Sequence, residues 1–330
     1  MKSLHLLLAL PARPDQIIQC ARDAAPSLIK MLQRGQPAAH EPSLAGTLCQ
    51  ACGIKQHQDW PLAPICAAAD DIHSAVGAPP GYWLRLDPVH LEVVMGGLIL
   101  RPPASLQLSQ DEARRLIDDI NLHWQPEGMK IQATNPTRWY LYLPERPNLH
   151  TTPVDQMGGE YLTPHLPRGA DARQFMQRIN EVQMLLHSHP VNVARENEGR
   201  PAVNGLWPWG GGFMPKFSPK FDLFVADIFE LQALANQAGR PFMPTPKTLT
   251  ELPACQHALV ALTQPEADWD GDLTNRLTQL EENWFQPLLR QMTWGRIRQM
   301  RLDLIGHQAV TLSPAMAWRF WRKTAVATPA

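Results

Sequence analysis

Residues 82–100 mark a change of pattern along the chain, and they read YWLRLDPVHLEVVMGGLIL. Apolar runs stand on either side of Gly96 and Gly97. Paired glycines between two such runs favour a tight β-hairpin, because its turn needs positive φ angles at both central positions. The sequence therefore predicts that a pair of antiparallel strands begins here.

The residues that follow extend this hairpin into a small α+β unit. Ser109 and Glu112 have the spacing of a capping box, and apolar residues then recur on one helical face. A second strand pair is expected at 129–133 and 138–143, and a second amphipathic helix at 171–187. The order ββαββα is typical of a compact α+β domain.

The segments on both sides of this unit have the pattern of an α/β protein. Leu4–Leu10 predicts a buried strand rather than a signal peptide, because His5 interrupts a short apolar run. A helix is expected over 24–35, beginning at Pro26 and ending at Gly35 in a left-handed conformation. Further elements are expected as helices at 223–238 and 273–292 and as strands at 257–262 and 302–305.

Strands that alternate with helices indicate an open, mostly parallel sheet. The simplest architecture is a discontinuous α/β core, made of residues 1–80 and 205–330. Residues 81–204 interrupt this core as an inserted, smaller α+β domain.

Composition excludes several classes of protein. The chain has 330 residues, of which 44% are hydrophobic and 18% charged, so it can bury a sizeable core. Thirty basic residues face 31 acidic ones, and the net charge of −1 indicates neither a nucleic-acid nor a membrane partner. Five scattered cysteines do not form a secreted disulfide framework, so we expect a cytoplasmic protein.

Polar residues are densest over 187–212, which read HSHPVNVARENEGRPAVNGLWPWGGG. The His189 and Arg195 side chains can pair with a phosphate or carboxylate, and three glycines allow backbone amides to approach an anion. Alternatively, the segment is a hinge between insert and core. It is not a Walker loop, because no Gly-Lys-Ser or Gly-Lys-Thr follows.

Two arginines on predicted strands are also candidates for ligand contacts. Arg85 and His90 lie on a half-buried strand and can face a ligand. The alternative for Arg85 is an exposed pair with Asp87, which contributes little to stability. Arg138 is a similar, weaker candidate.

The cysteine pair Cys49 and Cys52, with Cys66 fourteen residues on, has ligands that zinc accepts, and His57 or His73 would have to complete the site. A redox pair or inert buried cysteines are the alternatives. Carboxylates that suit a divalent metal cluster at Asp70 and Asp71 and again at Asp268 and Asp270. Solvated loops, or a helix cap at Asp272, explain the same residues without a metal.

The order of these motifs resembles the cofactor-independent phosphoglycerate mutases of the archaeal type, in the alkaline phosphatase superfamily. Within that group it resembles a bacterial branch of RpfE-type regulatory proteins. Segments 25–35, 83–91, 189–212 and 268–272 carry the resemblance, and 189–212 is the most specific. It implies an alkaline-phosphatase-like fold. It also implies a ligand site for a small phosphorylated or carboxylated metabolite formed by Arg85, His189, Asn192, Arg195 and Asn204.

The chain departs from that family at the residues of its chemistry. No Asp-Gly follows the first strand, and no Ser precedes Asp70 in Ala67-Ala68-Ala69. No His follows in the stretch 268–272, and only His307 remains of a late Asp-His pair. A phosphoserine mechanism needs both a nucleophile and metal ions. The resemblance therefore implies a non-catalytic regulatory or metabolite-sensing protein that needs no cofactor.

Two alternatives stay open. One is an active mutase or phosphatase with a rearranged manganese or zinc site, drawn from Asp70, Asp71, Asp268, Asp270 and His307. The other is a scaffold for a protein partner, in which Trp318 and Trp321 anchor an interface.

Overall fold

The computed structural model of the chain describes residues 1–72, 81–157, 161–264 and 269–318. Two compact units divide the chain: Met1–Leu48 with Ser218–Ala330, and Cys49–Phe217. The second unit contains the predicted insert, 81–204, together with its flanks.

A seven-stranded sheet in the order β2-β12-β11-β1-β10-β8-β9 forms the centre of the first unit. Its inner strands are parallel, and only β12 is reversed, because it pairs antiparallel with both β11 and the edge strand β2. The strands are β1 (Ser3–Ala9), β2 (Gln36–Ala38), β8 (Leu223–Val225), β9 (Phe242–Met243), β10 (His257–Thr263), β11 (Gln299–Leu304) and β12 (Gln308–Leu312). The predicted α/β class is confirmed, as are the three strands expected near β1, β10 and β11.

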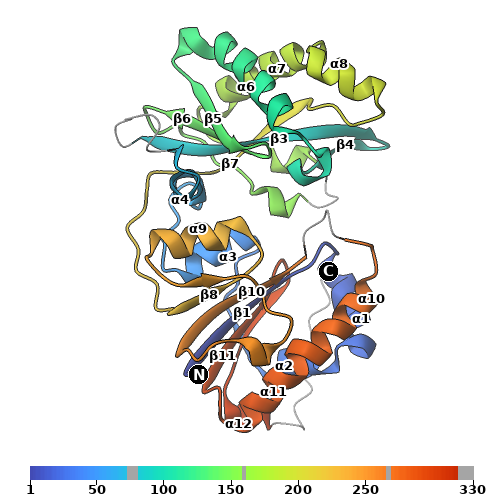
Figure 1. Ribbon diagram of the computed structural model, residues 1–330, viewed down its shortest axis with the longest axis vertical. Helices are drawn as coiled ribbons and strands as arrows, with labels where there is room; N and C mark the ends of the chain where they lie inside the picture. The colour runs from blue at the N-terminus through green and yellow to red at the C-terminus, as the bar shows by residue number, and fades with distance from the viewer. Residues whose placement is uncertain (73–80, 158–160, 265–268, 319–330) are drawn as a thin grey trace. The chain divides into compact units, whose positions relative to one another are not determined.

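Helices cover both faces of this sheet (Figure 1). Four of them bury Leu4, Leu6 and Leu8 of β1 on one face: α1 (Pro14–Ala24), α2 (Pro26–Arg34), α10 (Leu273–Leu280) and α11 (Gln286–Thr293). A π-helical turn, Glu281–Phe285, joins α10 to α11, so the predicted long helix is present with an extra residue in one turn. The other helices of this unit are α9 (Phe229–Gln237), which lies on the opposite face, α3 (Leu44–Ala51), which crosses the unit boundary, and α12 (Pro314–Ala317).

Two local predictions in the first unit are wrong. The segment expected as one helix over 223–238 begins with strand β8, because Leu223 pairs with Ala258 of the neighbouring strand. Gly35 ends α2 with a φ of −65°, which is not left-handed. Glycine is required there by close packing, since a Cβ would lie 2.7 Å from Cβ of Val310.

The second unit is an antiparallel sheet around the long strand β3. Its strands are β3 (Tyr82–Val94), β4 (Gly97–Arg101), β5 (Lys130–Asn135), β6 (Arg138–Leu143) and β7 (Gly205–Gly212). Helices α6 (Gln110–Trp124) and α7 (Ala172–His187) bury one face of the sheet. The predicted order ββαββα, with the hairpin and both helices, is therefore correct.

The remaining elements of this unit are α4 (Leu62–Ala69), which contacts β3 and β7, and α8 (Pro190–Asn197). Every residue of β7 is buried, and it pairs with β3 from Gly205 to Gly212. The glycine-rich segment is thus a strand of the sheet and not a hinge. Single 3-10 turns lie at Pro103–Leu106, Gln125–Glu127, Val154–Gln156, Thr163–His165 and, in the first unit, Leu249–Glu251.

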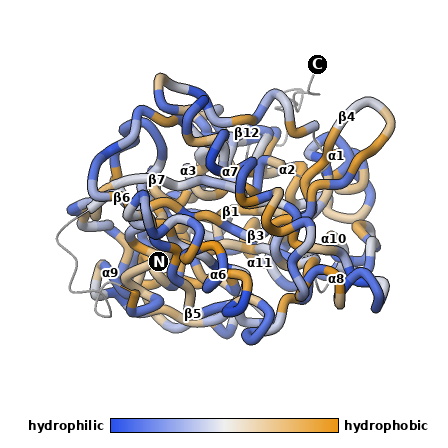
Figure 2. The backbone as a smooth tube through the Cα atoms, turned by 90° about the horizontal axis from the view of Figure 1, so that it is seen from above, coloured by the Kyte–Doolittle hydropathy of each residue, from blue (hydrophilic) through white to orange (hydrophobic). Residues whose placement is uncertain are grey.

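The β3–β4 hairpin extends beyond its sheet with apolar residues at its tip. Figure 2 shows it as an orange loop, and Val93 and Met95 are 82% and 99% exposed. Among the described residues, every helix is too short or too polar to cross a membrane.

Candidate functional site

The sequence-predicted ligand residues of 187–204 lie in the second unit, where they hold α8 and the chain after it. His189 caps α8: its Nδ1 accepts the Val191 amide at 3.1 Å, so Nε2 carries the proton that faces Asp119 at 3.0 Å. Asn192 Nδ2 donates to two backbone carbonyls at 2.8 Å, and its Oδ1 accepts the Val203 amide at 2.9 Å. The polar atoms of His189 and Asn192 therefore have hydrogen-bond partners within the second unit.

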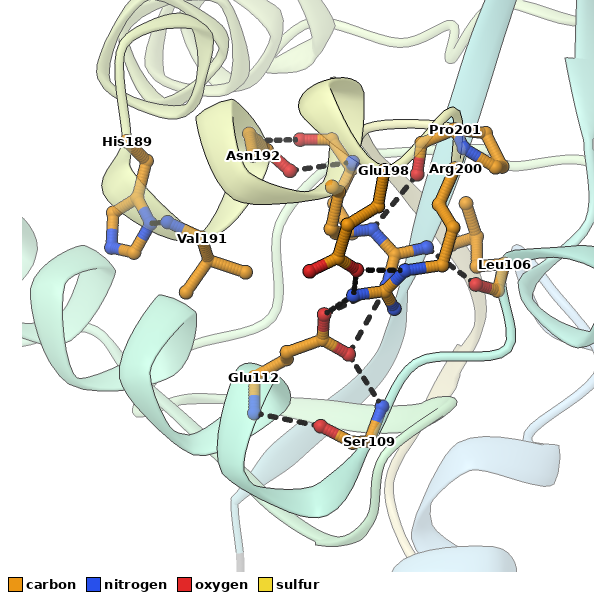
Figure 3. A network of polar contacts seen from close by, with 11 residues as sticks. Leu106, Ser109, Glu112, His189, Val191, Asn192, Glu198, Arg200 and Pro201 are labelled. Carbon is orange, nitrogen blue, oxygen red and sulfur yellow. Dashed lines mark hydrogen bonds and ion pairs between the residues drawn. The ribbon is translucent and has the colours of Figure 1, made fainter.

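Arg195 is fully buried beside the N-terminus of α6. Its guanidinium donates to both oxygens of Glu112 at 3.1 Å and to the carbonyls of Leu106 and Pro201. Figure 3 shows Glu112 also accepting from Ser109 and pairing with Arg200. Burial alone would raise the pKa of Glu112, but these hydrogen bonds and charges lower it to about 2.

Arg85 and Asp87 form a buried pair rather than the exposed pair considered above. Arg85 Nε and Nη2 donate to the two Asp87 oxygens at 2.9 Å, and both residues are less than 5% exposed. The guanidinium lies over the rings of Tyr140 and Trp209, 5.3 and 5.0 Å from their centroids. Trp209 Nε1 completes the set by donating to Asp87 at 2.7 Å.

Asn204 and Asp70 are likewise occupied by neighbours. Asn204 bonds the Leu91 amide and carbonyl at 2.6 and 2.9 Å, as a paired strand residue would. Asp70 accepts Arg138 at 2.8 and 3.0 Å and the Tyr140 hydroxyl at 2.7 Å. Burial opposes ionisation of Asp70, but these donors outweigh it and lower its pKa. The ligand role predicted for Arg138 and for the five residues of the family resemblance stays a prediction. A ligand would have to replace existing contacts of these residues, which are Arg85, His189, Asn192, Arg195 and Asn204.

One backbone amide of the glycine-rich segment 205–212 does contact a carboxylate, but this carboxylate is a side chain of the same unit. The Gly211 amide donates to Asp59, which is 6% exposed and also accepts the amide of Thr151 at 2.9 Å. Burial raises the pKa of Asp59, and these donors oppose the shift. Asp59 was not among the predicted residues.

The cysteine pair fits the reading of inert buried thiols best. Cys49, Cys52 and Cys66 are all buried. Burial raises the pKa of Cys52 to about 12, so the thiol is protonated and unreactive at neutral pH. The possible fourth ligand His73 lies outside the described residues.

The family that the chain resembles uses metal ions, so the donor residues decide whether such a site fits here. Within the described ranges, no three His, Cys, Asp or Glu side chains come together as a metal site would require. Asp270 accepts the Asp272 amide at 2.9 Å, and Asp272 caps α10 as predicted. Asp71 lies beside Asp70 in the second unit, His307 follows β11 in the first, and Asp268 is outside the described residues. The described residues therefore do not fit a metal centre.

A different group of polar residues lies at the carboxyl edge of the parallel sheet in the first unit. Strand β8 continues through α9 to β9, whereas its neighbour β10 continues through α10 to β11 on the other side. Open α/β sheets bind ligands where the strand order reverses in this way, outside the carboxyl ends of the strands. The residues found there are Asp227 after β8, Thr245 after β9, Thr263 at the end of β10 and Arg276 in α10, hereafter the carboxyl-edge cluster.

Several polar atoms of this cluster make no hydrogen bond within the described part of the chain: Nε of Arg276 and the hydroxyls of Thr263 and Thr245. Thr263 is only 7% exposed. Arg276 Nη2 reaches the Thr263 carbonyl at 3.4 Å, and Asp227 accepts the Thr245 amide at 3.0 Å. Burial lowers the pKa of Arg276, and the charge of Asp227 opposes that shift.

Buried polar atoms without partners are uncommon, and they indicate a missing ligand or water. A guanidinium beside a hydroxyl binds a carboxylate or phosphate. The sequence analysis missed Arg276. Its position in the sequence could have identified it, because Arg276 lies four residues after the Asp272 cap, at the start of a helix that follows a buried strand. The first turn of such a helix lies at the carboxyl edge of a parallel sheet.

The chain is therefore an α/β protein with a mostly parallel sheet, an α+β unit and a cluster of polar residues at the carboxyl edge of the sheet. No known family model matches the chain. It is similar to the 2,3-bisphosphoglycerate-independent phosphoglycerate mutase of Methanosarcina mazei, with 32% identity over 119 residues, or 36% of this chain and 30% of that protein. The mutase of Methanosarcina acetivorans is 32% identical over 147 residues, or 42% of this chain and 37% of that protein. The matches thus span about a third of the length of these curated relatives.

Two solved structures resemble the whole chain loosely. The cofactor-independent phosphoglycerate mutase from Thermoplasma acidophilum has a TM-score of 0.43 at 18% identity and covers 95% of this chain, which spans 90% of that one. The PH0037 protein from Pyrococcus horikoshii has a TM-score of 0.49 at 12% identity, with coverages of 94% and 87%.

Proposed function

We propose that this chain is a phosphoglycerate-mutase-like protein that binds a small phosphorylated or carboxylated metabolite without metal-dependent turnover. The observation that carries the proposal is the carboxyl-edge cluster, where Arg276 Nε and the Thr263 hydroxyl are buried and have no hydrogen-bond partner among the residues that the structure describes. The partial similarity to phosphoglycerate mutases supports a phosphate- and carboxylate-bearing ligand.

The centre of the sheet supports the non-catalytic half of the proposal. Strand β1 leads into Leu10, Pro11 and Ala12, whose side chains carry neither a metal donor nor a nucleophile. A regulatory role of the RpfE type and a cytoplasmic location belong to the same proposal.

Two assays on the full chain test it. Conversion of 3- to 2-phosphoglycerate is measured with added Mn²⁺, and we expect no turnover from folded protein. The melting temperature is then measured in EDTA with and without 3-phosphoglycerate. A ligand at a concentration of about 100 times its Kd stabilises the folded state by about 2.7 kcal/mol. Arg276→Gln should lose this stabilisation, because it removes the cation of the cluster.

Arg240→Gln is the matched control, since Arg240 is an exposed arginine of the same unit outside the cluster. Turnover would overturn the non-catalytic assignment. An equal ligand-induced rise in Tm for Arg276→Gln and the wild type would overturn the placement of the site.

A further inference from the structure

A cavity with a volume of about 280 Å³ opens on the helical face of the first unit, between α2 and α11. Its lining residues recur three or four positions apart, so one face of each helix forms a wall. They include Ser27, Lys30 and Arg34 from α2, and Leu289, Arg290 and Thr293 from α11.

Three of the lining residues are cations and none is a carboxylate. Arg34 is held in place because its Nη1 donates to the Ala317 carbonyl at 2.5 Å. Lys30 and Arg290 form no side-chain hydrogen bond or ion pair within the described ranges. The carboxylate of Glu281 contacts the Ser27 amide with both oxygens at 3.1 Å, but it is buried and does not line the cavity.

Like charges that converge on one space repel each other, and an anion that enters the space relieves this repulsion. Arginine binds phosphate through paired N–H donors, and lysine binds it as a point charge. Leu289 adds an apolar wall. The exposed Trp318 stands beside the cavity, because its Nε1 donates to the carbonyl of the lining residue Thr293 at 3.0 Å.

We infer that this cavity binds the phosphate group of a small phosphorylated ligand, with Lys30, Arg34 and Arg290 as the phosphate contacts. It shares no residue with the carboxyl-edge cluster, so this inference and the proposed function fail independently. The cavity is a second anion site of the first unit.

Calorimetric titration of the full chain with pyrophosphate and inorganic phosphate at low salt tests the inference. The test variant is Lys30→Gln/Arg290→Gln. Its control is Lys2→Gln/Arg240→Gln, which removes the same two charge types from exposed positions of the same unit. We expect the test variant to bind pyrophosphate at least about tenfold more weakly, because it loses two charge-assisted contacts. The control should stay within about twofold of the wild type.

A third variant separates the two sites. Arg276→Gln leaves the cavity intact, so it should keep the pyrophosphate binding that depends on Lys30 and Arg290. Circular dichroism melting checks that each variant is folded. Absence of pyrophosphate binding by the wild type, equal binding by test and control variants, or loss of binding in Arg276→Gln alone would each overturn the inference.

Discussion

At the scale of single residues, Glu112 serves two structural purposes at once. Its carboxylate accepts the Ser109 amide at 2.9 Å, which is the capping box that the sequence predicts. The same group neutralises Arg195, which is fully buried, and pairs with Arg200 at 2.9 Å. The first contact is local, so the spacing of Ser109 and Glu112 in the sequence predicts it. The second joins residues 83 positions apart, so only the fold reveals it.

Glu112 should make stability depend on acid pH. Its pKa is about 2 in the folded chain against an ordinary 4.5, so the ionised form stabilises the native state above the ordinary value. This contribution is lost as pH falls from about 4.5 towards about 2. We expect Glu112→Gln to lose about 1.5–3 kcal/mol at pH 7, because Arg195 loses a charged partner.

Urea unfolding at pH 7, 5 and 3 measures this effect. Glu145→Gln is the control, because Glu145 is an exposed acid whose side chain makes no hydrogen bond in the described part of the second unit. The deficit of Glu112→Gln should shrink at pH 3. A deficit that is equal at pH 3 and pH 7 would contradict the assigned role.

Arg85 shows why the candidate site was only partly predictable. Its spacing from Asp87 places both side chains on one face of a strand, and their pairing was among the sequence alternatives. Burial of that pair depends on Trp209, which lies 122 positions from Asp87 and contacts it only because β7 pairs with β3. Removing one partner of such a pair leaves an uncompensated buried charge, so Arg85 has a structural role whatever else it contacts.

At the scale of elements, predictions succeeded where periodicity was long and ended in clear caps. Both amphipathic helices of the second unit and the hairpin at Gly96 meet that condition. Predictions failed for β7 and β8. Glycine and proline are rare inside ordinary strands, and β7 contains Pro208 and four glycines. Three residues of β8 are too few to establish a period.

The glycines of β7 should be intolerant of even one methyl group. A Cβ on Gly211 would overlap the Tyr82 hydroxyl and lie 2.8 Å from Leu84 Cδ2. Both neighbours are buried, so they cannot move into solvent. We expect Gly211→Ala to destabilise the second unit by about 1–3 kcal/mol, as overpacking typically does. Urea unfolding measures the loss, and stability equal to the wild type would show that the sheet adjusts freely.

At the scale of the whole molecule, the sequence boundaries at 80 and 205 follow changes of pattern, whereas the second compact unit runs over Cys49–Phe217. The physical reason is that α4 and β7 contact β3. Each unit has a hydrophobic core of its own: Leu6 belongs to the core of the first unit, and Leu116 to that of the second. Separate cores are what independent cooperative unfolding requires.

The two cores should therefore respond separately to matched substitutions. Leu6→Ala and Leu116→Ala remove the same atoms from fully buried positions, and each should cost about 2–5 kcal/mol. Hydrogen exchange in moderate urea, read by mass spectrometry on peptides of each unit, should show faster exchange in the altered unit alone. Equal acceleration in both units by either substitution would mean that the cores unfold as one. The same measurement then assigns any ligand to a unit, because binding slows exchange in the unit that holds it.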